Sequence, residues 1–63
     1  MMKETFNKMI DDLREIADYK GYKGSLYNLF IWQNYEQQMM FMYEYGLNTS
    51  AKREKFYKYL SNF

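Results

Sequence analysis

The segment from Leu26 to Tyr45 constrains the fold of this chain more than any other. It reads LYNLFIWQNYEQQMMFMYEY and contains neither proline nor glycine, so we predict one long helix. The segment is too apolar for an exposed helix of a small protein. The polar stretch QNYEQQ in its middle also makes it too polar to span a bilayer. Other parts of the fold, or another protein, must therefore cover it.

Projecting this segment at 100° per residue separates two apolar faces. The face that we expect to pack in the core of the chain comprises Ile31, Trp32, Tyr35, Met39, Met42 and Tyr43. The opposite face, which we expect to contact a partner or a second copy, comprises Leu26, Leu29, Phe30, Gln33, Gln37, Met40 and Phe41. Because a chain of 63 residues has too little material to cover both faces, we expect a homodimer.

Two further helices flank the central one. Apolar residues recur at steps of three and four between residues 3 and 20, as in an amphipathic helix; they are Phe6, Met9, Ile10, Leu13, Ile16 and Ala17. Gly21 is expected to end this helix, and Ser25 to cap the next one. Gly46 should end the central helix, with Leu47 folding back on its last turn.

The third helix is expected to begin near Thr49 or Ser50 and to run to about residue 62. No strand-like alternation interrupts these segments. The sequence therefore predicts an all-α fold, a single three-helix domain over residues 1–63 with helices at about 3–20, 26–45 and 50–62.

Catalysis and metal binding have little support. The chain has no cysteine and no histidine, which excludes disulfides, thiolate ligands and imidazole bases. Ser25 and Ser50 are explained as helix caps, and no glycine-rich phosphate loop is present. The acidic run of the first helix, formed by Asp11, Asp12, Glu15 and Asp18, is most simply a solvated face. We expect a non-enzymatic protein with no catalytic residue, no metal site and no cofactor.

The N-terminus has no long apolar run before Asp11, so it does not resemble a signal peptide. The absence of cysteine fits a cytoplasmic protein. We therefore expect a cytoplasmic location, which is the host cytoplasm if the gene belongs to a phage, and no membrane partner.

The charges are unevenly distributed, although the net charge is only +1. Residues 49–63 contain four basic side chains, Lys52, Arg53, Lys55 and Lys58, against Glu54. Cations in the first turn of a helix oppose its dipole, so a partner with phosphates or carboxylates would explain Lys52 and Arg53 there. Alternatively, such a small exposed penalty is simply tolerated.

The connection YKGYKG adds Lys20 and Lys23 as candidate contacts for an acidic protein or a nucleic acid. Its simpler interpretation is a turn with solvated lysines. The segment 38–60 matches a DNA-binding helix-turn-helix poorly, because Lys52 and Lys55 fall where that motif has apolar residues.

The run Leu26-Tyr27-Asn28-Leu29-Phe30-Ile31 resembles a helix in small phage proteins of Gram-positive bacteria that inhibit the host's helicase loader. The whole chain, which has no Cys, His or Pro and is rich in Lys, Asn, Tyr and Met, also resembles accessory proteins of phages and mobile elements. This resemblance implies an inhibitor of a host enzyme, such as a replication component or a CRISPR nuclease.

The sequence thus predicts a small protein-interaction module that acts as a stoichiometric inhibitor or regulator of a larger host protein. The alternative is a small dimeric nucleic-acid-binding regulator that uses the basic segment 50–62.

Overall fold

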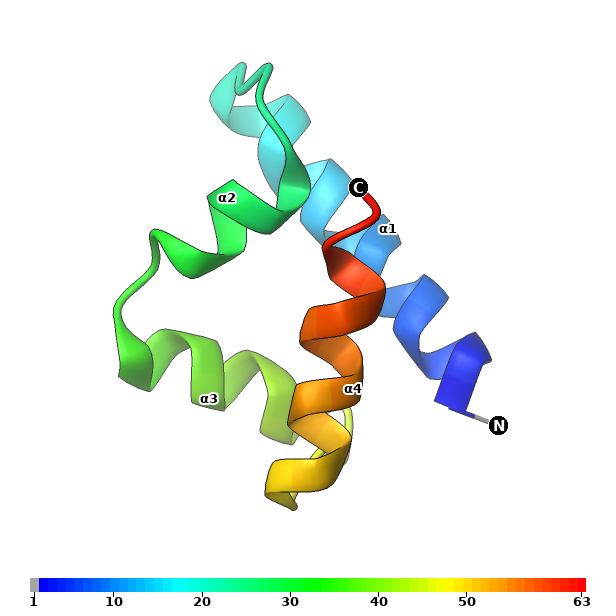
Figure 1. Ribbon diagram of the computed structural model, residues 1–63. Helices are drawn as coiled ribbons and strands as arrows, with labels where there is room; N and C mark the ends of the chain where they lie inside the picture. Colours follow the sequence, from blue (N-terminus) through cyan, green and yellow to red (C-terminus); the bar gives the residue numbers. More distant parts are fainter. Residues whose placement is uncertain (1) are drawn as a thin grey trace.

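The fold is all-α, as predicted. The structure is a computed structural model that describes residues 2–63, and no strand occurs among them. Its helices are α1 (Met2–Lys20), α2 (Leu26–Ile31), α3 (Tyr35–Glu44) and α4 (Ser50–Leu60) (Figure 1). The prediction of one continuous helix over 26–45 is wrong, because a turn at residues 32–34 divides it into α2 and α3.

Each helix after α1 begins at a side chain that accepts a hydrogen bond from a backbone amide in the first turn. The Ser25 hydroxyl accepts from the Asn28 N–H at 3.1 Å, and Thr49 accepts from the Lys52 N–H at 3.3 Å. The Ser25 cap was predicted. The last helix was expected to begin near Thr49 or Ser50; Thr49 is its cap, whereas Ser50, interpreted as a cap in the sequence, is the first residue of α4. The third cap is Asn34, whose side chain accepts from the Gln37 N–H at 2.8 Å and so starts α3.

Glycines end α1 and α3, as predicted. Gly21 and Gly46 have φ angles of 69° and 81°, in the left-handed region that glycine adopts without strain. After Gly46 the chain reverses, and the Leu47 N–H donates to the Met42 carbonyl at 3.0 Å. Leu47 is thereby buried against the core, which confirms its predicted return onto the last turn.

The side chain of Gln38 stabilises the turn between α2 and α3. Its amide nitrogen Nε2 donates to the carbonyls of Ile31 and Gln33 at 3.3 and 2.9 Å, and its Oε1 accepts from the Tyr57 hydroxyl. The carbonyl groups that a helix end leaves without partners are thus satisfied by a side chain of the next helix. This contact ties the turn to α4.

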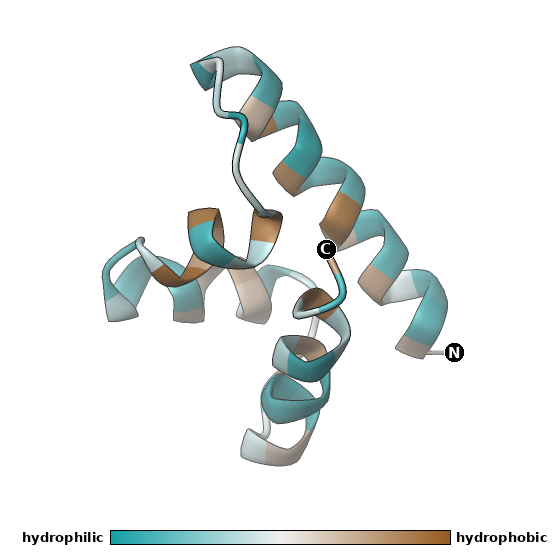
Figure 2. Cartoon of the chain, turned by 45° about the horizontal axis from the view of Figure 1, so that its top comes forward, coloured by the Kyte–Doolittle hydropathy of each residue, from teal (hydrophilic) through white to brown (hydrophobic). Residues whose placement is uncertain are grey.

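The core lies where α1, α2 and α4 meet, with the end of α3 and Leu47 closing it. Its buried apolar side chains are Phe6, Met9, Ile10, Leu13, Ala17, Leu26, Leu29, Phe30, Met42, Leu47, Phe56 and Leu60. Figure 2 shows the apolar positions of the helices gathered mainly on their inward sides. Phe30 is at its centre, 5.5 Å from Phe41 and 5.6 Å from Phe56 between ring centroids.

The prediction of which face of residues 26–45 packs in the core is wrong. Leu26, Leu29 and Phe30, expected at a partner interface, are buried in the core. The expected core residues Ile31, Trp32, Tyr35 and Tyr43 are instead exposed, and only Met42 of that set is fully buried. The helical projection fails because the turn at 32–34 gives α2 and α3 different axes, so residues on either side no longer share one face.

α1 and α4 pack through an aromatic cluster near the start of α1. The Phe6 ring lies 5.5 Å from Phe56 and 5.4 Å from Tyr59, and the Tyr59 hydroxyl donates to the Asn7 side chain. The Leu26 N–H donates to the Phe63 carbonyl at 3.1 Å, which joins the start of α2 to the segment after α4. In residues 2–63 no helix has the length and apolar character needed to cross a membrane.

Candidate interaction surfaces

Most of the large apolar side chains that remain exposed belong to the turn at 32–34 and its neighbouring helices. We call this group the 31–43 surface; its members are Ile31, Trp32, Tyr35, Met40 and Tyr43. Trp32 is 70% exposed and Tyr35 is 73% exposed. Trp, Tyr and Met are the residue types enriched in protein–protein interfaces, so this surface is the first candidate site.

Two of the rings on the 31–43 surface are positioned by contacts within the chain. The Trp32 ring meets Tyr22 edge-on, with centroids 6.0 Å apart and planes at 85°. The Arg53 guanidinium lies over the Tyr43 ring, 5.4 Å from its centroid. Rings that are held before binding lose less conformational freedom when a partner covers them.

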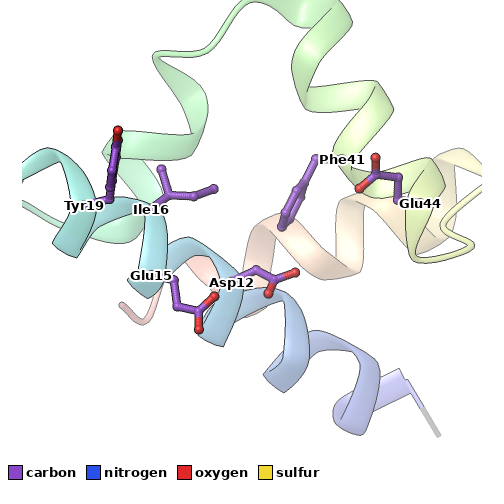
Figure 3. Close-up of a pocket in the computed structure, with 6 residues that line it drawn as sticks. All are labelled: Asp12, Glu15, Ile16, Tyr19, Phe41 and Glu44. Atoms are coloured by element: carbon purple, nitrogen blue, oxygen red, sulfur yellow. The ribbon is translucent and has the colours of Figure 1, made fainter.

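A second candidate site is an open groove of about 400 Å³ between α1 and α3. Its lining residues come from adjacent turns of these two helices: Asp12, Glu15, Ile16, Tyr19, Phe41 and Glu44. Figure 3 shows the Phe41 ring extending from α3 toward α1 and the Ile16 side chain extending into the same space. The volume falls in the range of about 300–1,000 Å³ that is typical of ligand sites.

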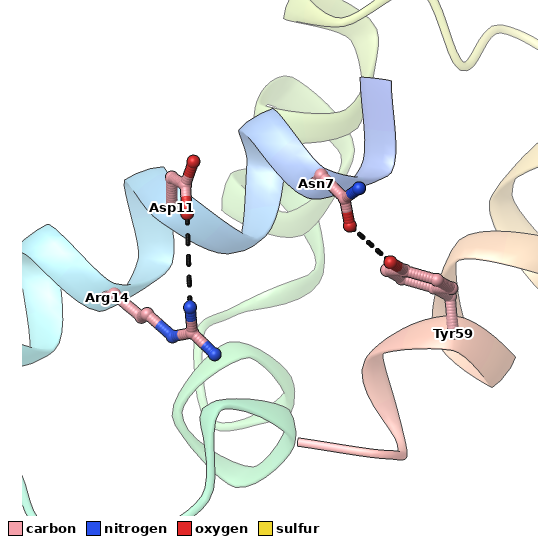
Figure 4. A network of polar contacts seen from close by, with 4 residues as sticks. All are labelled: Asn7, Asp11, Arg14 and Tyr59. Carbon is pink, nitrogen blue, oxygen red and sulfur yellow. Dashed lines mark hydrogen bonds and ion pairs between the residues drawn. The ribbon is translucent and has the colours of Figure 1, made fainter. Parts of the chain in front are cut away.

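The groove is apolar inside and acidic at its edges. Asp12 accepts a hydrogen bond from the hydroxyl of Tyr45, the residue that follows α3. Among residues 2–63, Arg14 and Asp11 form an ion pair with a nitrogen–oxygen distance of 4.0 Å (Figure 4). Neither residue lines the groove. The carboxylates of Asp12, Glu15 and Glu44 therefore have no cationic partner in the described part of the chain, where no cluster suited to a metal ion was found either.

The remaining residues of the predicted interface do not form one face. The Gln33 side chain donates to the Leu29 carbonyl at 3.3 Å, and Phe41 is half-buried at the edge of the core and the groove. Met40 and Gln37 are exposed on α3. Of the seven residues predicted, Met40 belongs to the 31–43 surface and Phe41 to the groove.

The basic residues of α4 are divided between two roles. The Arg53 guanidinium donates to the Leu47 carbonyl at 3.2 Å and stacks on Tyr43, so intrachain contacts explain its place in the first turn. Lys52, Lys55 and Lys58 are exposed. The connection that contains Lys20 and Lys23 lies at the other end of the molecule from the start of α4, so the six predicted basic contacts are not brought together (Figure 1).

Tyr57 lies beside the 31–43 surface and has a perturbed ionisation. Partial burial raises the pKa of its hydroxyl above the ordinary value, and the nearby Tyr35 and Tyr27 raise that pKa further. Arg53 acts in the opposite direction on the same pKa. This hydroxyl donates to Gln38, so the neutral form is the one that the fold uses.

Sequence reasoning missed the groove and the turn, although a signal for the turn was present. Asn34 followed by Gln37 has the spacing of a helix N-terminus, which predicts the start of α3. Ile16 was assigned to the core stripe of α1, yet it is 38% exposed on the side that faces the groove.

Comparison of the chain with known protein families, curated proteins and solved structures found no match.

Proposed function

We infer that this chain is a non-enzymatic protein-interaction module that binds a larger protein through the 31–43 surface. Its action is stoichiometric inhibition or regulation, as the resemblance to small phage and mobile-element proteins implies. The observation on which this rests is the exposure of Trp32 and Tyr35, two large rings next to an ordered turn.

Exposure of a surface of this composition to water is energetically unfavourable. Each large aromatic ring buries 150–250 Å² at an interface, and at about 25 cal/mol per Å² a few such rings supply the core of a binding site. The turn at 32–34 is closed by hydrogen bonds from Gln38, so the rings are presented on a defined backbone. Shape and composition therefore favour a protein partner.

The test is affinity capture from the lysate of the host, with quantification of the captured partner. The double variant Trp32→Ala/Tyr35→Ala should keep the far-ultraviolet circular dichroism of the natural chain and lose the partner by at least tenfold, because hot-spot residues each contribute about 2 kcal/mol or more. Glu4→Ala is the control, because Glu4 is exposed on α1 and belongs neither to this surface nor to the groove. Undiminished capture by the double variant would contradict the proposal.

The alternative function is nucleic-acid binding through α4. Its basis is the exposed set Lys52, Lys55 and Lys58, which is smaller than the sequence predicted because Arg53 is engaged within the chain. A salt titration against random duplex DNA distinguishes the two functions, since phosphate binding weakens steeply as salt rises. Absence of DNA binding at low salt would leave the protein-binding function alone.

Self-association is the second expectation that remains a proposal. Sedimentation equilibrium at micromolar concentration should give a mass of twice 7.9 kDa if two copies pair through the 31–43 surface. In that case Trp32→Ala should shift the equilibrium toward the monomer. A natural chain that stays monomeric would remove the second copy as a partner.

A further inference from the structure

We propose that the groove between α1 and α3 binds a basic amphipathic helix of a partner protein. This site is separate from the 31–43 surface, so it stands or fails independently of the function proposed above.

The groove has the length of a helix-binding site. On α1 its lining residues run from Asp12 to Tyr19, about two turns or ~10 Å at 1.5 Å per residue. Ile16 belongs to the apolar stripe of α1, yet it remains 38% exposed, and Tyr19 is almost fully exposed. An amphipathic helix places side chains at i, i+3, i+4 and i+7 into a groove of this kind.

The carboxylates of the groove favour a bound helix that is positively charged. Asp12 and Glu15 line the groove from α1, and Glu44 lines it from α3, so carboxylates flank the apolar interior formed by Ile16 and Phe41 on both walls (Figure 3). No cation among the described residues lies within 4.0 Å of these carboxylates. A helix with lysines or arginines on both sides of an apolar stripe complements this arrangement, whereas an acidic helix is repelled.

The first experiment uses two synthetic helical peptides that share a leucine stripe. One has lysines flanking the stripe, and the other has glutamates at the same positions. Titrated into the isotope-labelled chain, the lysine peptide should shift the amide resonances of residues 12–19 and 41–44 and leave the fluorescence of Trp32, the single tryptophan, unchanged. Equal binding of both peptides, or shifts centred on Trp32, would overturn the proposal.

The second experiment removes the charge of the groove. Glu15→Gln/Glu44→Gln should weaken the lysine peptide about two- to thirtyfold, the effect of losing two partly exposed ion pairs. Glu4→Gln/Glu36→Gln is the matched control, because it changes the same charge on the same two helices at positions that do not line the groove. Equal weakening by both double variants would show that only the net charge matters, which contradicts the proposed site.

Sedimentation of the same variants tests whether a second copy occupies the groove instead. The proposal requires the oligomeric state to be the same for the natural chain and for Glu15→Gln/Glu44→Gln. A dimer that dissociates in this variant, and that the lysine peptide also disrupts, would identify the occupant as a second copy and overturn the inference.

Discussion

Tyr22 has the only buried side-chain polar atom without a hydrogen-bond partner among residues 2–63. Its ring packs edge-on against Trp32, and its hydroxyl end lies against Gly24, where a Cβ would collide with it. A buried hydroxyl without a partner is unfavourable by about 1–3 kcal/mol. The ring of Tyr22 therefore contributes packing to the fold, whereas its hydroxyl contributes no hydrogen bond.

We predict that Tyr22→Phe leaves the free energy of unfolding unchanged or raises it, by up to about 1–3 kcal/mol. The measurement is urea denaturation followed by circular dichroism. Tyr59→Phe is the control, because it removes a hydroxyl that donates to Asn7 and should lower stability by about 0.5–1.5 kcal/mol. A larger loss for Tyr22→Phe than for Tyr59→Phe would show that the Tyr22 hydroxyl has a partner in solution.

The raised pKa of Tyr57 predicts how the free energy of unfolding changes at alkaline pH. Because burial and the neighbouring tyrosines raise the pKa of its hydroxyl, the folded chain keeps the Tyr57 proton at pH values where the unfolded chain has lost it. The stability from this group is complete below the unfolded pKa of about 10 and is lost as pH rises through the folded pKa. Denaturation curves between about pH 8 and pH 11 should show this decline, and Tyr57→Phe should reduce it. An equal decline in Tyr57→Phe would assign the effect to other tyrosines.

At the scale of elements, the decisive feature is the turn that divides residues 26–45. A continuous helix would have kept Leu26, Leu29 and Phe30 on a face opposite Met42. The turn lets α2 and the end of α3 bury these residues in one core, together with Leu47. The polar residues in the middle of this segment form the turn. Asn34 caps α3, and the side chain of Gln38 donates hydrogen bonds to the carbonyls of Ile31 and Gln33.

Removal of the α3 cap tests this account. We predict that Asn34→Ala lowers the free energy of unfolding by about 0.5–2 kcal/mol, because the amides of the first turn of α3 lose their acceptor. Asn48→Ala, at an exposed position before α4, should change stability by less than about 0.5 kcal/mol. If the two variants were equally stable, the turn would not depend on its cap.

The whole molecule buries its apolar residues at one centre and leaves two surfaces uncovered. Its radius of gyration is 11.0 Å, close to the ~11 Å expected for a compact domain of this length. α1, α2 and α4 pack closely, while α3 is joined to them mainly by side chains such as Phe41, Tyr45 and Gln38. This arrangement leaves the groove on one side of α3 and the 31–43 surface on another.

Two substitutions separate the core from the exposed surface. Phe56→Ala should lower the free energy of unfolding by about 3–5 kcal/mol, because this ring is fully buried between Phe6 and Phe30. Trp32→Ala should change it by less than about 1 kcal/mol, although Trp is the larger residue, because its ring is mostly in solvent. Thermal and urea denaturation of both variants is the measurement. A loss of several kcal/mol for Trp32→Ala would place that ring in the core.

The sequence by itself determined the helical class, the cap at Ser25, the start of the last helix near Thr49 or Ser50, the glycine ends at Gly21 and Gly46, and nearly all of the core stripe of α1. These features depend on residues within a few positions of one another, so local periodicity and turn chemistry predict them.

Only the tertiary structure decided which side of residues 26–45 is buried and where the open surfaces lie. Those outcomes depend on contacts between distant segments, such as Tyr57 with Gln38 and Tyr45 with Asp12. The sequence favoured the face with Ile31, Trp32 and Tyr35 as the core, whereas the structure buries Leu26, Leu29 and Phe30. The direction that the chain takes after Trp32 determines that Phe30 meets Phe56 and that Trp32 remains exposed.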